Sequence, residues 1–442
     1  MNKKVALIGE NSIGYVKKII EIWNNQECAV LIDFRLPNTT LLKIISDCNI
    51  QKCYIDCDYI DKFQELYVLN FEIYLFEKIN KEATFLPTNI YKLFKKNYSK
   101  KDAIVIFSSG TTGRSKGVRL SHYAINKNAD YIIDYMRPQK KDCIYIVKSL
   151  THSSTLIGEL LVGIKAKIPI LISNVVIPPR CILENIIRYN VAILCMNPKL
   201  LEMFIDYYQQ HNSSLNCLKT IYVSGSILRD SIYEKYKKIF RNINIYNVYG
   251  LTEAGPRVTA QTKKNSKSNS VGKSIKHVKI KLIDIDTKRI VNKGIGVIHV
   301  KTPCIFNGYL LGKAKFPSMY KKWLNTGDLG YFDKYKELHI VNRIDDLMII
   351  DSHKIYPFDI EEEIMKLSDI NDCCIIKEQK DDKQFLSCLY VSAYEKECEI
   401  REILKKTCLA YEIPKKFKRC GEIPRTLNGK INKAEVRKLL NK

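Results

Sequence analysis

The sequence predicts an α/β protein with a large N-terminal domain of parallel sheets layered with helices, a small β-rich subdomain, and a small α+β C-terminal domain. Three observations support this prediction. Short β-branched runs alternate with amphipathic stretches through most of the chain. After residue 277 the runs instead alternate apolar and polar residues one by one. Near residue 345 a fresh pattern of helices and strands begins.

The parallel-sheet part is predicted from buried-strand patterns that are each followed by a helical pattern. The first helical stretch extends to Trp23. Because parallel strands need long crossover connections, this alternation favours sheets covered by helices. The predicted strands lie at 5–9, 28–32, 103–107, 143–147, 168–172, 191–195 and 220–225.

The β-rich part is predicted from three runs typical of antiparallel strands, at 277–286, 296–302 and 337–342. Before them, the segment 261–270 (QTKKNSKSNS) is polar and lacks periodicity, which predicts an exposed loop.

The C-terminal part is predicted to begin with a helix at Pro357, since proline suits the first helical turn and the acidic residues after it suit the helix dipole. Strand-like runs follow at 373–377 and 385–394, and a second helix begins near Lys396. We therefore expect two domains, at 1–344 and 345–442.

Composition limits the classes of function. The 442 residues carry a formal net charge of +25, but the lysines are spread over the whole chain and lack the interleaved aromatic residues of a nucleic-acid groove. No run reaches the roughly 20 apolar residues of a membrane span, and the N-terminus does not have the pattern of a signal peptide. The fifteen cysteines match neither a disulfide framework nor a zinc site. These features predict a cytoplasmic protein that does not bind nucleic acid.

The segment 103–118 (AIVIFSSGTTGRSKGV) is a predicted buried strand followed by a loop rich in Ser, Thr and Gly. Glycines allow close backbone approach to a phosphate, hydroxyls and amides donate to its oxygens, and Lys116 supplies positive charge. The pattern differs from the Walker A loop because Gly113 and Lys116 are not adjacent. In isolation these residues would equally fit a tight polar turn.

Five segments in order resemble the acyl-adenylate-forming superfamily, which includes acyl- and aryl-CoA ligases, adenylation domains of peptide synthetases, and luciferases. The resemblance covers essentially the whole chain from about residue 4. The segments are SSGTTGRSKGV at 108–118, YGLTE at 249–253, NTGD at 325–328, RIDDLMI at 343–349 and PRTLNGK at 424–430.

The resemblance implies a set of nucleotide contacts. Tyr249 would pack on the adenine, and Thr252 would bind the α-phosphate. Glu253 would hold Mg²⁺, while Asp328 would accept the ribose hydroxyls and Arg343 would reach the ribose or the phosphate. The β- and γ-phosphates of ATP would lie in a loop made by Ser108, Ser109, Gly110, Thr111, Thr112, Gly113 and Lys116. The adenine and α-phosphate site would be lined by Gly225, Ser226, Asn247, Tyr249 and Gly250.

The same resemblance assigns the catalytic lysine and the hinge. Lys430 would stabilise the transition state in which the substrate carboxylate attacks the α-phosphorus and releases pyrophosphate. Asp345 matches the family's hinge, about which the small domain would rotate to withdraw Lys430 and admit a thiol.

The resemblance also bears on the acid and the acceptor. In α-amino-acid adenylation domains an aspartate pairs with the substrate ammonium, whereas the corresponding segment 149–163 contains His152 and no aspartate. A fatty or aromatic acid is therefore expected, with His152 gating its pocket, although a histidine there would also fit a core position. Lys354 would meet the phosphates of CoA or of a carrier protein's phosphopantetheine.

Three positions depart from the family pattern. Arg114-Ser115 replaces a proline of the phosphate loop, and Asn342 replaces a glycine. Ser352 stands where a glycine usually lines the pantetheine tunnel, which makes thioester formation less firmly expected than adenylation.

Two alternative functions remain. The first is an adenylating enzyme that loads an amino acid or passes its acyl group to an amine. The second is a non-catalytic nucleotide-binding relative, which the presence of Lys116, Glu253, Asp328, Arg343 and Lys430 disfavours.

Overall fold

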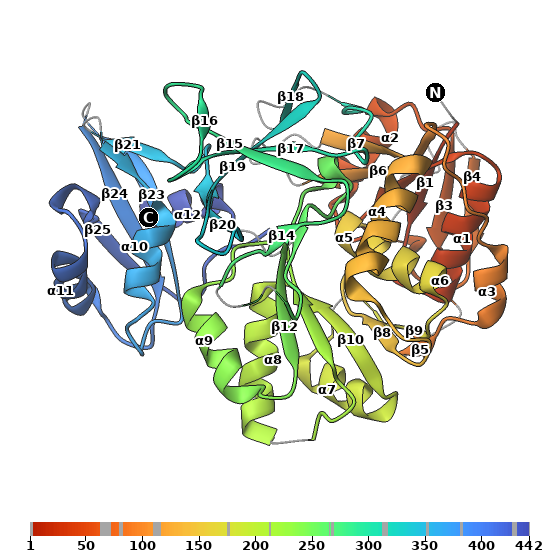
Figure 1. Ribbon diagram of the computed structural model, residues 1–442, viewed down its shortest axis with the longest axis horizontal. Helices are drawn as coiled ribbons and strands as arrows, with labels where there is room; N and C mark the ends of the chain where they lie inside the picture. Colours follow the sequence, from red (N-terminus) through yellow and green to blue (C-terminus); the bar gives the residue numbers. More distant parts are fainter. Residues whose placement is uncertain are drawn as a thin grey trace.

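The structure is a computed structural model with an α/β fold (Figure 1). The predicted fold class is confirmed by its parallel sheets and β-rich parts. The structure describes residues 3–61, 72–78, 83–108, 116–174, 177–211, 214–264, 266, 269–311, 317–350, 353–380, 383–426 and 431–441.

The first sheet has six strands in the order β4-β3-β1-β2-β6-β7, all parallel except β7, which pairs antiparallel with β6. Its strands are β1 (Lys4–Ile8), β2 (Cys28–Ile32), β3 (Lys52–Asp56), β4 (Glu72–Phe76), β6 (Asp102–Ser108) and β7 (Lys116–Ser121). The neighbouring helices are α1 (Ile13–Asn24), α2 (Asn38–Asp47), α3 (Thr88–Leu93) and α4 (His122–Met136). Side-chain caps fix two of these helices: Ser12 accepts a hydrogen bond from Tyr15 N, and Ser121 accepts one from Ala124 N.

The second sheet has eight strands in the order β14-β13-β12-β11-β10-β8-β9-β5. The central strands are parallel and the outer ones antiparallel. The strands are β5 (Thr84–Phe85), β8 (Cys143–Ile146), β9 (Ile170–Ile172), β10 (Val191–Met196), β11 (Thr220–Val223), β12 (Asn244–Tyr249), β13 (Thr259–Ala260) and β14 (Lys273–Ser274). The helical elements are α5 (Ser153–Thr155), the π-helix η3 (Leu156–Leu161), α6 (Val162–Ala166), α7 (Pro179–Arg188), α8 (Pro198–His211) and α9 (Asp230–Ile239).

A third sheet is antiparallel and corresponds to the predicted β-rich part (Figure 1). It contains β15 (Lys279–Ile283), β16 (Ile290–Val291), β17 (Gly296–Lys301), β18 (Ser318–Tyr320), β19 (Trp323–Phe332) and β20 (Leu338–Arg343). One prediction was wrong at its ends, because Gln261 and Ser270 of the expected exposed loop are fully buried. Gln261 Nε2 donates to Ser270 Oγ at 3.1 Å, so a side-chain bond anchors both ends of that loop.

The elements that follow residue 345 surround a separate apolar core that includes Ile355, Ile360 and Tyr390. They lie at the left of Figure 1, beyond the third sheet. The elements are β21 (Met348–Ile350), β22 (His353–Ile355), α10 (Pro357–Ile364), β23 (Asp372–Lys380), β24 (Lys383–Val391), α11 (Glu397–Thr407), β25 (Lys416–Cys420) and α12 (Lys433–Asn441). The domain division at 344/345 stays a prediction.

All fifteen cysteines lie in the described parts, each of them is free, and nine are buried. Burial raises the pKa of several of these thiols, Cys48 for example to about 11, so they act as small apolar side chains. Among the described residues, no helix is long and apolar enough to cross a membrane.

Candidate active site

Three parallel strands bring several predicted nucleotide residues to one edge of the second sheet. Met196 of β10, Val223 of β11 and Asn247 of β12 are neighbours in register, so the carboxyl ends of these strands lie level. Gly225 and Ser226 follow β11 and are exposed there. Gly225 has φ +107°, a conformation that favours glycine. Ligands of open α/β sheets bind outside the carboxyl ends of the strands.

Two residues near the end of β12, Asn247 and Gly250, are also required by the local structure. A Cβ on Gly250 would lie 1.8 Å from the carbonyl oxygen of Pro256, so only glycine fits there. Asn247 is buried, and its main chain exchanges hydrogen bonds with Gln261 at 2.9 and 3.1 Å. Both residues therefore shape the edge at which Tyr249 ends the strand.

Asp328 brings three of the sequence motifs together. Its Oδ2 accepts a hydrogen bond from the Tyr249 hydroxyl at 2.5 Å, and its Oδ1 lies 3.3 Å from Arg343 Nη1. Asp328 and Arg343 are paired across β19 and β20, which fixes their spacing. Burial and the Asp328 carboxylate raise the pKa of Tyr249 well above its usual value, so this hydroxyl stays protonated and donates.

Thr252 follows β12 and contacts the segment that contains His152. The hydroxyls of Thr252 and Ser153 lie 2.8 Å apart. His152 precedes α5, and its carbonyl accepts hydrogen bonds from Thr155 N and Leu156 N. The residues predicted for the α-phosphate and for the acid are therefore neighbours, although their roles stay predictions.

Glu253 is the carboxylate predicted to hold Mg²⁺. Its side chain is buried, and Oε1 accepts a hydrogen bond from the Tyr309 hydroxyl at 2.8 Å. The donor set fits, because Mg²⁺ prefers hard oxygen ligands and is commonly held by one or two carboxylates together with phosphates and waters. Among the described residues, no group of three or more His, Cys, Asp or Glu side chains is placed to hold a metal ion.

Several predicted residues fall partly or wholly outside the described chain. Ser108 and Lys116 face each other across β6 and β7, which places the two ends of the phosphate loop side by side. Lys354 lies in β22, where only its main chain is described. The positions outside the described residues are Ser109, Gly110, Thr111, Thr112, Gly113, Arg114, Ser115, Ser352 and Lys430.

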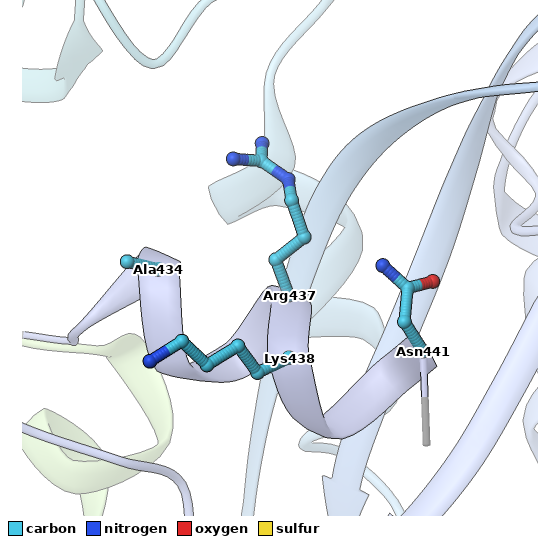
Figure 2. Close-up of a pocket in the computed structure, with 4 residues that line it drawn as sticks. All are labelled: Ala434, Arg437, Lys438 and Asn441. Atoms are coloured by element: carbon cyan, nitrogen blue, oxygen red, sulfur yellow. The ribbon is translucent and has the colours of Figure 1, made fainter.

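A surface hollow lies on α12 and contains none of the predicted site residues. It is lined by Ala434, Arg437, Lys438 and Asn441 (Figure 2). Figure 2 shows the long side chains of Arg437 and Lys438 extending from the helix. The convergent polar groups described above lie elsewhere, at the second and third sheets.

Comparison with known protein families identifies the family of this chain. A family model described as AMP-binding enzyme matches residues 1–310, which is more than half of the chain. The chain belongs to the AMP-binding enzyme family. This match contains the phosphate-loop segment and the YGLTE segment, two of the five on which the resemblance rests.

Curated members of the AMP-binding enzyme family show moderate identity. VraA of Staphylococcus haemolyticus, which carries the name of a long chain fatty acid-CoA ligase, is 26% identical over 434 residues, covering 93% of this chain and 87% of that protein. The 4-coumarate:CoA ligase 1 of Petunia hybrida is 26% identical over 350 residues, covering 75% of this chain and 64% of that protein. This homology supports an acid–thiol ligase of the AMP-forming type.

Solved structures of the same fold cover nearly the whole chain. An anthranilate CoA ligase, AuaEII, in complex with anthranoyl-AMP has a TM-score of 0.87 at 17% identity and covers 100% of this chain and 88% of that one. ATP-bound MatB from Rhodopseudomonas palustris has a TM-score of 0.87 at 20% identity and covers 99% and 89%.

Sequence reasoning missed two residues of this candidate site, Tyr309 and Ser153. Tyr309 lies far along the chain from Glu253, in the segment NGYL, which none of the five motifs contains. It comes close because Leu310 N donates to Gly117 O and Arg119 N donates to Gly308 O, which attach this segment to β7. Ser153 adjoins His152, but a serine at the start of a helix is usually interpreted as a helix cap, so its sequence position gave no functional signal.

Proposed function

We propose that this protein uses ATP to convert a carboxylic acid to an acyl-adenylate, releasing pyrophosphate, and then transfers the acyl group to the thiol of CoA. The contact of Asp328 with both Tyr249 and Arg343 is the observation that carries the proposal. A carboxylate held between a hydroxyl and a guanidinium at the carboxyl edge of a parallel sheet is suited to bind ribose hydroxyls.

In this proposal the nucleotide lies along the edge made by β11, β12 and the β19–β20 hairpin. Tyr249 contacts the base, Asp328 and Arg343 take the ribose, and Thr252 takes the α-phosphate. Mg²⁺ supplies positive charge to the phosphates, and Glu253 would be its protein ligand. The remaining contacts are those given above for the phosphate loop and for Gly225, Ser226, Asn247 and Gly250. ATP and Mg²⁺ are bound in one structure of the same fold, that of MenE from Bacillus subtilis.

The second half-reaction is assigned to the C-terminal part. We take residues 345–442 as a mobile domain that turns at Asp345, brings Lys430 to the α-phosphate for adenylation, and later presents Lys354 to the phosphates of the thiol substrate. The separate apolar core of these elements supports such a division, since a unit with its own core can move as one body.

The acid is proposed to lack an α-ammonium group. The segment 149–163 contains no aspartate to pair with such a group, and His152 lies beside the Thr252–Ser153 contact. Relatives named for long chain fatty acids and for 4-coumarate fit a fatty or aromatic acid.

The test is acid-dependent exchange of labelled pyrophosphate into ATP, with fatty, aromatic and α-amino acids compared. We expect exchange with fatty or aromatic acids. The Asp328→Asn variant removes a charge-assisted contact, so exchange at subsaturating ATP should fall by about 30-fold, equivalent to about 2 kcal/mol. The control is Asp286→Asn, an exposed carboxylate in the turn between β15 and β16, which should behave like the parent.

Exchange that depends only on α-amino acids would overturn the proposed acid class. Absence of exchange with every acid, together with unchanged ATP binding, would favour a non-catalytic nucleotide-binding protein. Product analysis with CoA, with a phosphopantetheine-loaded carrier protein and with an amine then separates the three acceptors.

A further inference from the structure

A buried group of polar side chains lies next to the adenylation residues, and the proposed mechanism does not use it. It consists of Tyr135, Lys148, Thr155, Glu159 and Arg257, and we call it the acyl-side cluster. Glu159 and Thr155 are fully buried and Arg257 is 4% exposed. Glu159 lies on the π-helix η3, a helix type that is rare and frequently marks functional sites.

The chain connects this cluster to the proposed site by three routes. Lys148 follows β8 and Arg257 lies between β12 and β13, so two of its members come from the carboxyl edge where the nucleotide residues lie. Arg257 is four residues after Glu253, and Thr155 is two residues after Ser153. The 2.8 Å contact between Thr252 and Ser153 then joins these two segments directly.

Several contacts hold the charged groups of the acyl-side cluster in place. Lys148 Nζ lies 3.0 Å from Glu159 Oε1. A Cβ placed on Gly158 would lie 3.2 Å from Arg257 Nη2, so the guanidinium packs against the π-helix at the residue before Glu159. The main chain of Arg257 is fixed by two hydrogen bonds of 3.0 Å with the side-chain amide of Asn128.

The charges of the acyl-side cluster do not balance. It contains two cations and one carboxylate, which leaves a surplus positive charge in a buried place. Burial raises the pKa of Glu159, while Lys148 and Arg257 act in the opposite direction. The negative charge of Glu159 is therefore less stable than the two positive charges around it. Buried cations without an anion are costly, and proteins usually pair them.

Hydrogen bonding in the acyl-side cluster is also incomplete. Within the part of the chain that the structure describes, Tyr135 OH, Thr155 Oγ1, Glu159 Oε2 and Arg257 Nε have no hydrogen bond of ordinary geometry, and their nearest polar neighbours are one another: Tyr135 interacts with Arg257, and Thr155 with Glu159. Buried polar atoms almost always form good hydrogen bonds in folded proteins, so several poorly formed ones in one place point to a further partner that the cluster binds. An occupant that satisfies the charge as well must be anionic.

We propose that the acyl-side cluster recognises a second, anionic group on the acid that is activated, so that the substrate is a dicarboxylic acid whose far carboxylate binds Arg257 and Lys148. This inference rests on the proposed function and narrows its acid class. A fatty or aromatic skeleton can separate the two carboxylates, one of which reacts near Thr252 while the other neutralises the cluster. A bidentate guanidinium–carboxylate contact provides both charge and geometry.

The experiment compares acids that differ only in the second group: hexanoate with adipate and 6-aminohexanoate, and benzoate with terephthalate. Acid-dependent pyrophosphate exchange gives kcat/KM for each. We expect the dicarboxylate to exceed its monocarboxylate by at least about tenfold, the effect of one charge-assisted hydrogen bond, and the amino acid to be the poorest.

Three variants test the assignment to Arg257. Arg257→Met should abolish the preference by raising KM for dicarboxylates much more than KM for monocarboxylates. Arg257→Lys should restore part of the preference, which a merely structural role would not predict. The matched control, Arg180→Met, changes a 70% exposed arginine on α7 and should leave every ratio unchanged.

The outcomes separate the two proposals. Exchange that treats mono- and dicarboxylates alike, or that Arg257→Met lowers equally for all acids, overturns the inference and assigns the cluster to buried water or to the reacting carboxylate. Exchange with no acid overturns the proposed function alone. In that case the shift in Tm that adipate causes decides the inference: a shift in the parent that Arg257→Met loses supports it, and equal shifts overturn it.

Discussion

Arg343 and Arg229 both lie among carboxylates, but the two clusters connect different parts of the molecule. Arg343 contacts Asp328 within a single hairpin, where the two residues are direct neighbours across β19 and β20. Arg229 precedes α9 of the second sheet, and its guanidinium faces three carboxylates of the C-terminal part. It lies 3.8 Å from Glu361, 3.5 Å from Glu362 and 3.7 Å from Asp372.

The difference is one of charge balance as well as of distance along the chain. Around Asp328 one carboxylate contacts one guanidinium and one hydroxyl, which makes a compact polar site where we propose that the nucleotide binds. Around Arg229 the carboxylates outnumber the guanidinium, although Arg425 also contacts Asp372. We infer that the first cluster is shaped for a ligand and the second for holding the C-terminal part against the second sheet in this arrangement.

The largest expected effect tests whether the nucleotide site depends on a charge brought by the C-terminal part. Lys430→Ala removes the proposed transition-state cation, so the rate of acid-dependent pyrophosphate exchange should fall more than about 100-fold. This fall is equivalent to an increase of about 3 kcal/mol or more in the activation free energy. Lys438→Ala is the control, because this lysine is 68% exposed on α12. Exchange within about threefold of the parent would show that adenylation proceeds without Lys430 and would remove the proposed link between the two parts.

A pH-dependent effect sharpens the comparison at the second cluster. Glu361 is deeply buried, and burial raises its pKa from 4.5 to about 7, with Arg229 and Lys433 acting in the opposite direction and Asp372 adding to the rise. Between these two values the folded protein binds more protons than the unfolded chain, so stability should fall as pH rises from about 4.5 to 7. The loss of unfolding free energy is at most about 3 to 4 kcal/mol, since each pKa unit is equivalent to about 1.4 kcal/mol.

Urea unfolding across this pH window measures that loss, and Glu361→Gln should flatten the curve because the amide does not titrate. Glu399→Gln provides the control, since this glutamate lies on the surface of α11. If Glu361→Gln and its parent show the same pH dependence, Glu361 stays ionised throughout and Arg229 neutralises it fully.

The sequence predicted the first cluster but not the second, and the reason is physical. The family resemblance of NTGD and RIDDLMI assigned Asp328 and Arg343 to one site, and the hairpin of β19 and β20 makes them direct neighbours. Arg229 and Glu361 are far apart in the chain, and each resembles an ordinary surface charge until the sheets are assembled. The parallel strands could also be predicted from the sequence. Short apolar runs such as 28–32 and 191–195 are typical of buried strands.

The segment 261–270 shows the opposite failure. Its polar composition predicted exposure, but Gln261 and Ser270 are buried through mutual hydrogen bonds and a bond from Ser270 to Glu337. Polar side chains can enter a core when they satisfy each other, and a single sequence does not show which partners will meet. The acyl-side cluster was missed because the sequence does not show that Lys148, Glu159 and Arg257 meet.

The smallest expected effect concerns Tyr309, which lies outside the five motifs and contacts a residue of the proposed nucleotide site. Its hydroxyl donates to Glu253 at 2.8 Å and keeps that carboxylate aimed, and burial raises its pKa, with Glu253 adding to the rise, so that it stays a donor. Tyr309→Phe should weaken saturation by Mg²⁺–ATP by about fivefold, about 1 kcal/mol, without changing the acid preference. Tyr320→Phe, in a side chain 69% exposed on β18, is the matched control. An unchanged Mg²⁺ titration for Tyr309→Phe would show that Glu253 keeps its position without the hydrogen bond from Tyr309. Glu253 would then resemble Asp328, whose contact with Arg343 lies within a single hairpin.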